Sequence, residues 1–137
     1  MKPLTRQCFL ALTFLITVSG LGYLLTDEFL SSQTMFGREN HYSQAWWQAA
    51  HVFIGALFLV SLGMLFSEHL RPKLLSNIKT RRRSGLVLLS LISLSSLSGY
   101  LILLLSNSTV VDWVELIHWL SGLLFALTLI YHLKFSK

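Results

Sequence analysis

Four long apolar runs divide the chain. The first three contain no Asp, Glu, Lys or Arg, and the fourth carries Asp112 and Glu115 near its start. About 20 apolar residues are enough for a helix to cross the hydrocarbon core of a bilayer. The pattern therefore predicts an all-α integral membrane protein with four transmembrane helices, which span Cys8 to Leu25, Ala45 to Phe66, Leu86 to Leu105, and Val110 to Leu133.

The composition agrees with this pattern. Hydrophobic residues make up 53% of the 137 positions and charged residues 12%, whereas about a quarter of the residues of a soluble domain are charged. A basic start followed by small residues also suits a cleaved signal peptide. The first apolar run is longer than the usual signal core, so we expect it to be a retained helix in the lipid bilayer.

The basic residues predict an orientation. Only Arg38 falls on one side of a four-span topology, and the other ten fall on the opposite side: Lys2, Arg6, Arg71, Lys73, Lys79, Arg81, Arg82, Arg83, Lys134 and Lys137. By the positive-inside rule, both termini and the middle loop are cytoplasmic. The net charge of +5 is therefore interpreted as a topology signal, and no nucleic-acid partner is expected.

The two outer connections differ in length. The segment from Asp27 to Gln44 is expected to form a loop long enough to contact a partner, whereas the turn from Ser106 to Thr109 is very short.

The two halves of the chain resemble each other. Aligning Ser19-Gly20 with Ser98-Gly99 matches the first and third helices, and placing His51 over His118 matches the second and fourth. The second match gives the shared pattern W-x-[QE]-x-x-H-x-x-x-G-x-L-F. We therefore predict one domain, residues 1–137, built from tandem two-helix repeats at about 7–69 and 85–136. The second and fourth helices then run parallel.

Four of the five histidines belong to the second and fourth helices or their ends, while His41 lies in the outer loop and is expected to be solvated. His51 and His118 lie about six residues inside the outer ends, and His69 and His132 lie at the inner ends. At 100° per residue, the 18 residues from His51 to His69 make about five turns. The 14 residues from His118 to His132 come within about 40° of a whole number of turns. Each pair is thus expected to share one stripe of its helix.

Two imidazoles at the same depth can supply both axial ligands of a haem iron. The parallel helices predict an outer pair, His51 with His118, and an inner pair, His69 with His132. No CxxCH occurs, so the sequence predicts one or two haems of b type. The alternatives are a histidine that hydrogen-bonds a neighbouring helix and, at the inner end, a histidine at the lipid–water interface.

Small residues near these histidines are further candidates for haem contact, because a wide macrocycle needs room. They are Gly20, Gly55, Gly99 and Gly122. The alternative is that glycine simply permits close helix packing. Phe58 and Phe125 suit either a haem edge or a packed core. Gln48 and Glu115, one turn before the outer histidines, are expected to be interfacial, with a quinone or a haem propionate as the alternative partner.

The repeated His-x-x-x-Gly pattern resembles small four-helix bacterial membrane b-type cytochromes, in particular the flavinylation-associated cytochrome family, over nearly the whole chain. That family often has two later histidines in each copy, 14 and 18 residues after the first. Here Leu65 occupies the first of these positions in one copy and His69 the second, whereas the other copy has His132 followed by Ser136. The inner pair is therefore offset by about one helical turn, roughly 5.4 Å.

The resemblance implies electron transfer between the quinone pool and an extracytoplasmic or membrane redox protein, for example a flavin carrier. It also implies a multi-pass protein of the bacterial inner membrane that works as one subunit of a membrane oxidoreductase complex rather than as a complete enzyme. The competing hypothesis is a non-redox protein: an accessory or assembly subunit of a larger membrane complex, or a small transporter.

Overall fold

The computed structural model describes residues 2–35, 37–76 and 82–135. Four residues used in the sequence argument lie outside these ranges: Lys79, Arg81, Ser136 and Lys137.

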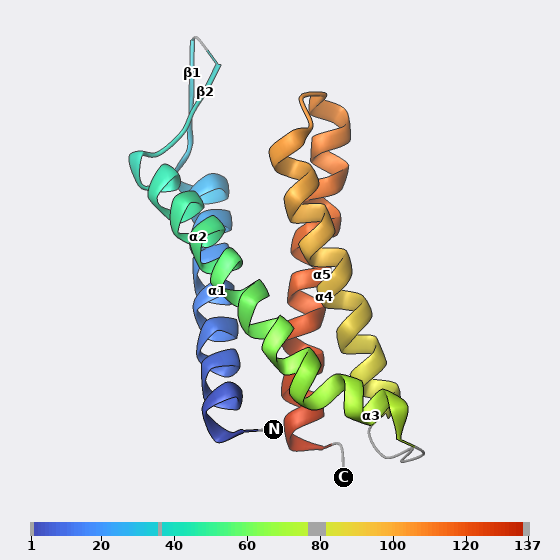
Figure 1. Ribbon diagram of the computed structural model, residues 1–137. Coiled ribbons are helices and arrows are strands. Elements are labelled where there is room, and N and C mark those ends of the chain that lie inside the picture. The colour runs from blue at the N-terminus through green and yellow to red at the C-terminus, as the bar shows by residue number, and fades with distance from the viewer. Residues whose placement is uncertain (1, 36, 77–81, 136–137) are drawn as a thin grey trace. The chain divides into compact units, whose positions relative to one another are not determined.

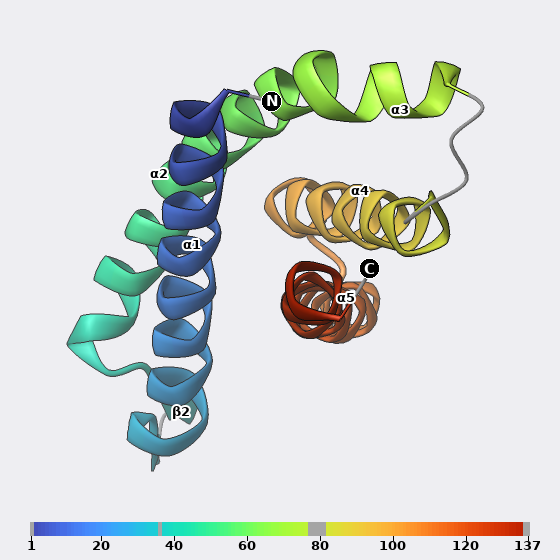
Figure 2. The same cartoon turned by 90° about the horizontal axis from the view of Figure 1, so that it is seen from below.

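Two helical hairpins make up the described chain (Figure 1). In the first, α1 (Pro3–Leu30) packs against α2 (Tyr42–Leu65), and in the second, α4 (Arg82–Leu104) packs against α5 (Ser108–Lys134). Figure 2 shows the paired helices of each hairpin from below. The chain divides into two compact units, Met1–Pro72 and Lys73–Lys137. The division falls between the two predicted repeats, while the assembly of both units into one four-helix bundle stays a prediction.

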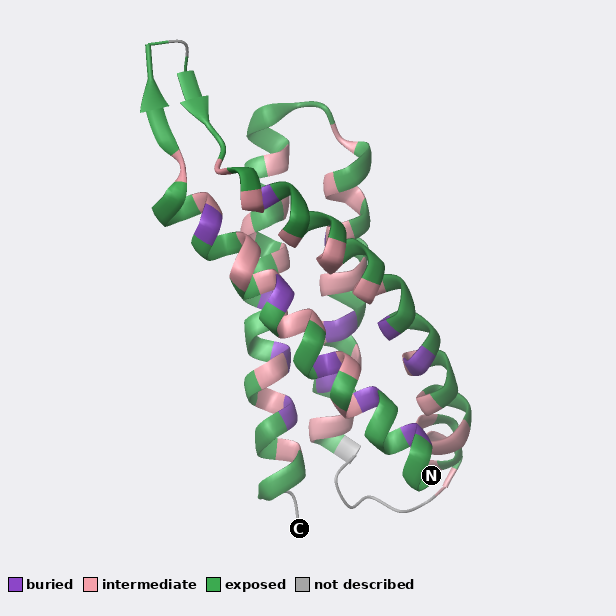
Figure 3. Cartoon of the chain, turned by 90° about the vertical axis from the view of Figure 1, so that its left-hand side faces the viewer, coloured by how far each residue is buried: buried purple, intermediate pink, exposed green. Residues whose placement is uncertain are grey.

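Four helices are long and apolar enough to cross a membrane, which confirms that part of the sequence prediction. Only 11% to 17% of the most apolar window of each span is buried within the protein. Figure 3 shows the consequence, because most of the helical surface is exposed and buried positions form small patches. Phe14, Phe53 and Val60 are each at least 66% exposed. Such a surface is unfavourable in water and requires an apolar medium or another apolar chain.

The outer connection of the first hairpin differs from the prediction. Asp27 still belongs to α1 and Gln44 already belongs to α2, so the expected long loop is shorter at both ends. Its middle forms two antiparallel strands, β1 (Ser32–Thr34) and β2 (Gly37–Glu39). Gly37 has a φ of 115°, a backbone conformation that glycine adopts without a steric penalty. The second outer connection is short, as predicted, because α4 ends at Leu104 and α5 begins at Ser108.

The inner end of α2 continues as a π-helical turn, η1 (Phe66–Leu70), followed by α3 (Arg71–Leu75). His69 lies within this π-helical turn. A π-helical turn inserts a residue relative to the α-helix, and such turns are frequent at functional sites. The turn count from His51 to His69 assumed an uninterrupted α-helix, so it does not apply beyond Leu65.

Each hairpin has a small core built at repeat-equivalent positions. In the first hairpin Phe9 and Phe58 are 6% and 2% exposed, and their ring centroids lie 5.5 Å apart. Their equivalents in the second hairpin, Leu88 and Phe125, are 9% and 6% exposed. Both phenylalanines of the shared pattern are therefore buried in hairpin cores. These two pairs of repeat-equivalent positions are therefore buried in both hairpins.

Candidate functional site: a serine–histidine–glycine cluster in each hairpin

His51 of the first hairpin lies against the outer half of α1. It is half-buried, nine residues after the start of α2. Its Nδ1 atom lies 3.0 Å from Oγ of Ser19, a side chain that is 2% exposed. A Cβ atom added at Gly20 would lie 3.0 Å from Cε1 of the same imidazole. The pair Ser19-Gly20 thus provides both a polar contact and the space for the ring.

His118 of the second hairpin has the same surroundings. It is half-buried, ten residues after the start of α5. Its Nδ1 atom lies 3.3 Å from Ser98 Oγ and 2.9 Å from the Ser95 carbonyl oxygen. A Cβ atom at Gly99 would lie 2.8 Å from Cε1 of His118. The two outer histidines therefore sit at nearly the same depth in their own helices, roughly 14 and 15 Å from the start at 1.5 Å per residue.

The hydrogen bonds assign the same imidazole tautomer to both histidines. The Ser19 hydroxyl donates its one hydrogen to the Ile16 carbonyl at 3.0 Å, so its oxygen accepts from His51 Nδ1. The Ser95 carbonyl can only accept, so Nδ1 of His118 carries the proton as well. In the neutral imidazole this arrangement places the proton on Nδ1 of both rings and the lone pair on Nε2. This is the arrangement of most metal-ligating histidines, whose second nitrogen donates to a protein acceptor.

The four glycines singled out in the sequence divide into two kinds. Gly20 and Gly99 contact the imidazole of their own hairpin, a role that differs from direct contact with a cofactor. A Cβ atom at Gly55 or Gly122 would meet only Ile16 Cδ1 at 3.7 Å or Ser95 Oγ at 3.6 Å, which are ordinary contacts. Packing inside the hairpin therefore does not require glycine at 55 or 122. Their role at a cofactor stays a prediction.

The inner histidines are placed differently in the two hairpins. His132 lies near the end of α5, and its Nδ1 atom is 2.8 Å from Ser84 Oγ on α4. This contact repeats the serine–histidine arrangement one level further inward. His69 lies in the π-helical turn η1 instead. His132 thus shares a serine contact at Nδ1 with His118 but not the glycine contact, because a Cβ atom at Gly85 would have nothing within 4 Å.

His41 is more ordered than the expectation of a solvated loop residue. It is half-buried and forms the N-cap of α2, where its Nδ1 accepts from the backbone amide of Ser43 at 3.3 Å. Its ring also lies 4.2 Å from that of Tyr42, centroid to centroid. Its role is therefore structural, at the start of the helix.

Two close contacts were missed by the sequence argument. A Cβ atom at Gly22 would lie 2.6 Å from Cδ2 of Trp47, so glycine at this position makes room for the indole. The serines of the two Ser-Gly pairs were used only to align the repeats. Hydrogen bonding of a histidine to a neighbouring helix was one of the alternatives, but these serines were not named as the partners. The sequence did contain a signal for these contacts, because a serine and a histidine occur at matched positions of both repeats.

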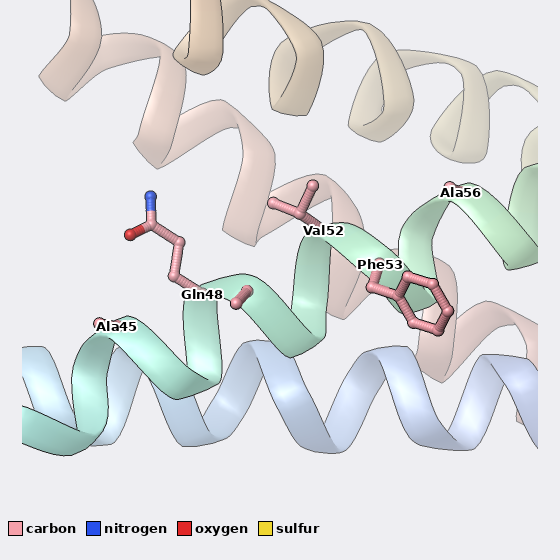
Figure 4. A pocket seen from close by; sticks show the side chains of 6 residues that line it. Ala45, Gln48, Val52, Phe53 and Ala56 are labelled. Atoms are coloured by element: carbon pink, nitrogen blue, oxygen red, sulfur yellow. The ribbon is translucent and has the colours of Figure 1, made fainter.

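An open depression runs along α2, and His51 is not among the residues that line it (Figure 4). Gln48 extends away from the helix at this depression and is exposed. The lining is otherwise apolar and mostly small: Ala45, Ala49, Val52, Phe53 and Ala56. The interfacial position expected for Gln48 stays a prediction.

Within the described residues, no group of three or more His, Cys, Asp or Glu side chains is close enough together to hold a metal ion. Comparison of the chain with protein-family models, with curated proteins and with solved structures gives no significant match.

Proposed function

We propose that the chain is a haem b electron-transfer subunit of a bacterial inner membrane, with His51 and His118 as axial ligands of one haem. The observation that carries the proposal is the matched pair of serine–histidine–glycine clusters. An imidazole inside an apolar span is costly and is usually functional. Here two occur at equivalent positions, each with Nδ1 hydrogen-bonded inside its own hairpin.

The donor set fits the cofactor. A bis-imidazole haem needs one Nε2 lone pair from each of two histidines, and the assigned tautomers supply it. Bound haem would contribute one-electron transfer, with no coordination position open to oxygen or substrate. The protein would contribute the ligands, their orientation through Ser19 and Ser98, and an apolar setting.

A second haem is proposed for His69 and His132, one level further inward. The Ser84–His132 contact supports a ligand role for His132. This site is less symmetric than the outer one. His69 lies in a π-helical turn, and the two inner histidines are offset by about one helical turn in sequence. The electron partners would be the quinone pool and an extracytoplasmic or membrane redox protein. Both termini would face the cytoplasm, as the distribution of Lys and Arg predicts.

Haem content tests the proposal. The measurement is the haem-to-protein ratio of the purified full-length chain, from a reduced-minus-oxidised spectrum and pyridine extraction. We expect a ratio near two in the wild type if both pairs bind haem and near one if only the outer pair does. His51→Ala and His118→Ala should each remove one haem, because the iron loses an axial ligand. The matched control is His41→Ala, which changes a helix cap and should leave the ratio unchanged.

Two results would overturn the assignment. Full haem content in His51→Ala and His118→Ala would remove these residues as ligands. A wild-type chain without haem, expressed with adequate haem supply, would contradict the cytochrome proposal. That result would favour the second candidate, a non-redox accessory or assembly subunit, for which the largely exposed apolar helix surface is the supporting observation.

A further inference from the structure

The two outer clusters are equivalent in sequence but unequal in their hydrogen bonds. In the first hairpin, the acceptor for His51 Nδ1 is the hydroxyl of Ser19 at 3.0 Å. In the second, the Ser95 carbonyl accepts from His118 Nδ1 at 2.9 Å, and the Ser98 hydroxyl lies further away at 3.3 Å. The position equivalent to Ser95 is Ile16, whose carbonyl accepts from the Ser19 hydroxyl instead.

We propose that Ser19 and the Ser95–Ser98 pair are positioning groups that hold His51 and His118 as Nδ1–H tautomers and make the two Nε2 atoms unequal in basicity. The positions of the protons do not depend on the proposed haem function. The effect on the reduction potential of the haem rests on that function. A hydrogen bond from Nδ1–H to an acceptor makes Nε2 a stronger donor to a metal. A peptide carbonyl accepts more strongly than a hydroxyl, so His118 is the more basic ligand.

The consequence concerns the reduction potential. Hydrogen bonds to the ligands are one of the means by which a protein sets the potential of a haem. A more basic imidazole stabilises ferric iron relative to ferrous iron and lowers the potential. Loss of the acceptor at Ser19 should therefore raise the potential of the outer haem. Loss of the Ser98 hydroxyl should raise it less, because His118 keeps the Ser95 carbonyl.

The first test reads the tautomers directly and does not depend on haem. The full-length chain is expressed without haem supply and labelled with ¹⁵N-histidine, because iron bound to Nε2 would by itself keep the proton on Nδ1. The Nδ1 and Nε2 resonances are recorded on this haem-free protein, with His51→Ala and His118→Ala for assignment. We expect Nδ1–H on both rings in the wild type. Ser19→Ala should abolish the predominance of Nδ1–H on His51, whereas Ser98→Ala should leave His118 as Nδ1–H.

The second test is the midpoint potential from a spectroelectrochemical titration. We expect an upward shift in Ser19→Ala, a smaller upward shift in Ser98→Ala, and a potential near the wild-type value in Ser19→Thr, which keeps the hydroxyl. If Ser19→Ala does not accumulate, Ser19→Cys should give an intermediate shift, because a thiol is a weak acceptor.

The outcomes separate the two proposals. Absence of haem from the wild type contradicts the proposed function but leaves the tautomer measurement intact. Persistent Nδ1–H on His51 in the haem-free Ser19→Ala variant would overturn the positioning role. So would a shift in potential that is as large in Ser98→Ala as in Ser19→Ala, or as large in Ser19→Thr as in Ser19→Ala.

Discussion

The interior of each hairpin is rich in small hydroxyl residues, although its exterior is apolar. Thr13, Thr26 and Ser61 are each at most 6% exposed. Their hydroxyls donate to backbone carbonyls three or four residues earlier, at 2.7 to 2.9 Å. Such bonds satisfy a polar group where water is absent, and small residues let two helices approach closely. At the residue scale, small hydroxyl residues and glycines therefore allow the two helices of a hairpin to pack closely. Ser19 also contacts His51.

Alanine at the glycines beside the histidines tests this fit. Gly99→Ala should destabilise the protein by about 1–3 kcal/mol, the usual cost of overpacking, because the new methyl group would lie 2.8 Å from His118 Cε1. Gly20→Ala should cost somewhat less, since the corresponding distance to His51 is 3.0 Å. The measurement is the free energy of unfolding in detergent micelles.

The matched control is Gly63→Ala, which lies in α2 with nothing within 4 Å of the added Cβ. It should leave the free energy of unfolding unchanged or raise it by up to about 1 kcal/mol, the helix preference of alanine over glycine. If alanine at 63 and alanine at 99 changed the free energy of unfolding equally, the contact between residue 99 and the imidazole would not contribute to stability.

At the scale of elements, the two hairpins have residues of different size at one pair of repeat-equivalent positions. Gly22 and Trp47 meet at the interface of α1 and α2, where the indole occupies the space over the glycine. The repeat alignment places Leu101 and Val114 at the equivalent positions of the second hairpin. A small–large pair in one copy thus corresponds to two residues of medium size in the other. Such a swap conserves volume, which is the kind of change that packed interiors tolerate best.

A double-mutant cycle tests whether the two positions are coupled. Gly22→Leu alone should destabilise the first hairpin by about 1–3 kcal/mol through overpacking. Trp47→Val alone should also destabilise it, because a cavity forms where the ring was. The double variant should be more stable than the sum of the two predicts, with a coupling energy of about 0.5–3 kcal/mol. Unfolding in detergent micelles gives all four free energies.

The control cycle pairs Trp47→Val with Gly63→Leu, which has no neighbour to share with Trp47. Its two effects should add to within about 0.5 kcal/mol. Additivity in the Gly22 cycle as well would refute the idea that the pair was exchanged as a unit.

Asp27 links the outer connection of the first hairpin to the ends of its two helices through an ion pair and a hydrogen bond. Its Oδ2 atom lies 3.3 Å from Arg38 Nη2, and its Oδ1 accepts from Gln44 Nε2 at 2.8 Å. Arg38 Nε also donates to Ser31 Oγ at 3.0 Å. A two-stranded sheet of this size is marginal by itself, so these contacts account for its order.

At the scale of the whole molecule, the exposed apolar helices and the charge distribution together predict an orientation. In a Cys8→Ser background, Gln33→Cys on β1 should react with a membrane-impermeant maleimide in intact cells. Ser76→Cys, after α3, should react only once the cells are opened, because the loop rich in Lys and Arg is retained in the cytoplasm. The reverse pattern of labelling would contradict the proposed topology.

The candidate site was predictable only in part. Histidines at matched repeat positions and glycines nearby were visible in the sequence, since both depend on spacing. The contact of Ser19 with His51 was not, because it depends on the rotation of α1 against α2. The unequal acceptors were also hidden, because Ser95 takes part through a backbone carbonyl, and residue type does not report which carbonyl a side chain will meet.

The sequence by itself determined the four helices and the duplication, because run length and the repeat of Trp, His, Gly and Phe are properties of the linear chain. It left undetermined the strands within the outer connection, which depend on contacts of Asp27 with Arg38 and Gln44, and the π-helical turn at His69. Only the tertiary structure decided which small residues lie against the imidazoles, namely Gly20 and Gly99, and which oxygen atoms lie within hydrogen-bond distance of each Nδ1. Those outcomes depend on distances of a few ångströms between helices, which no spacing along one helix encodes.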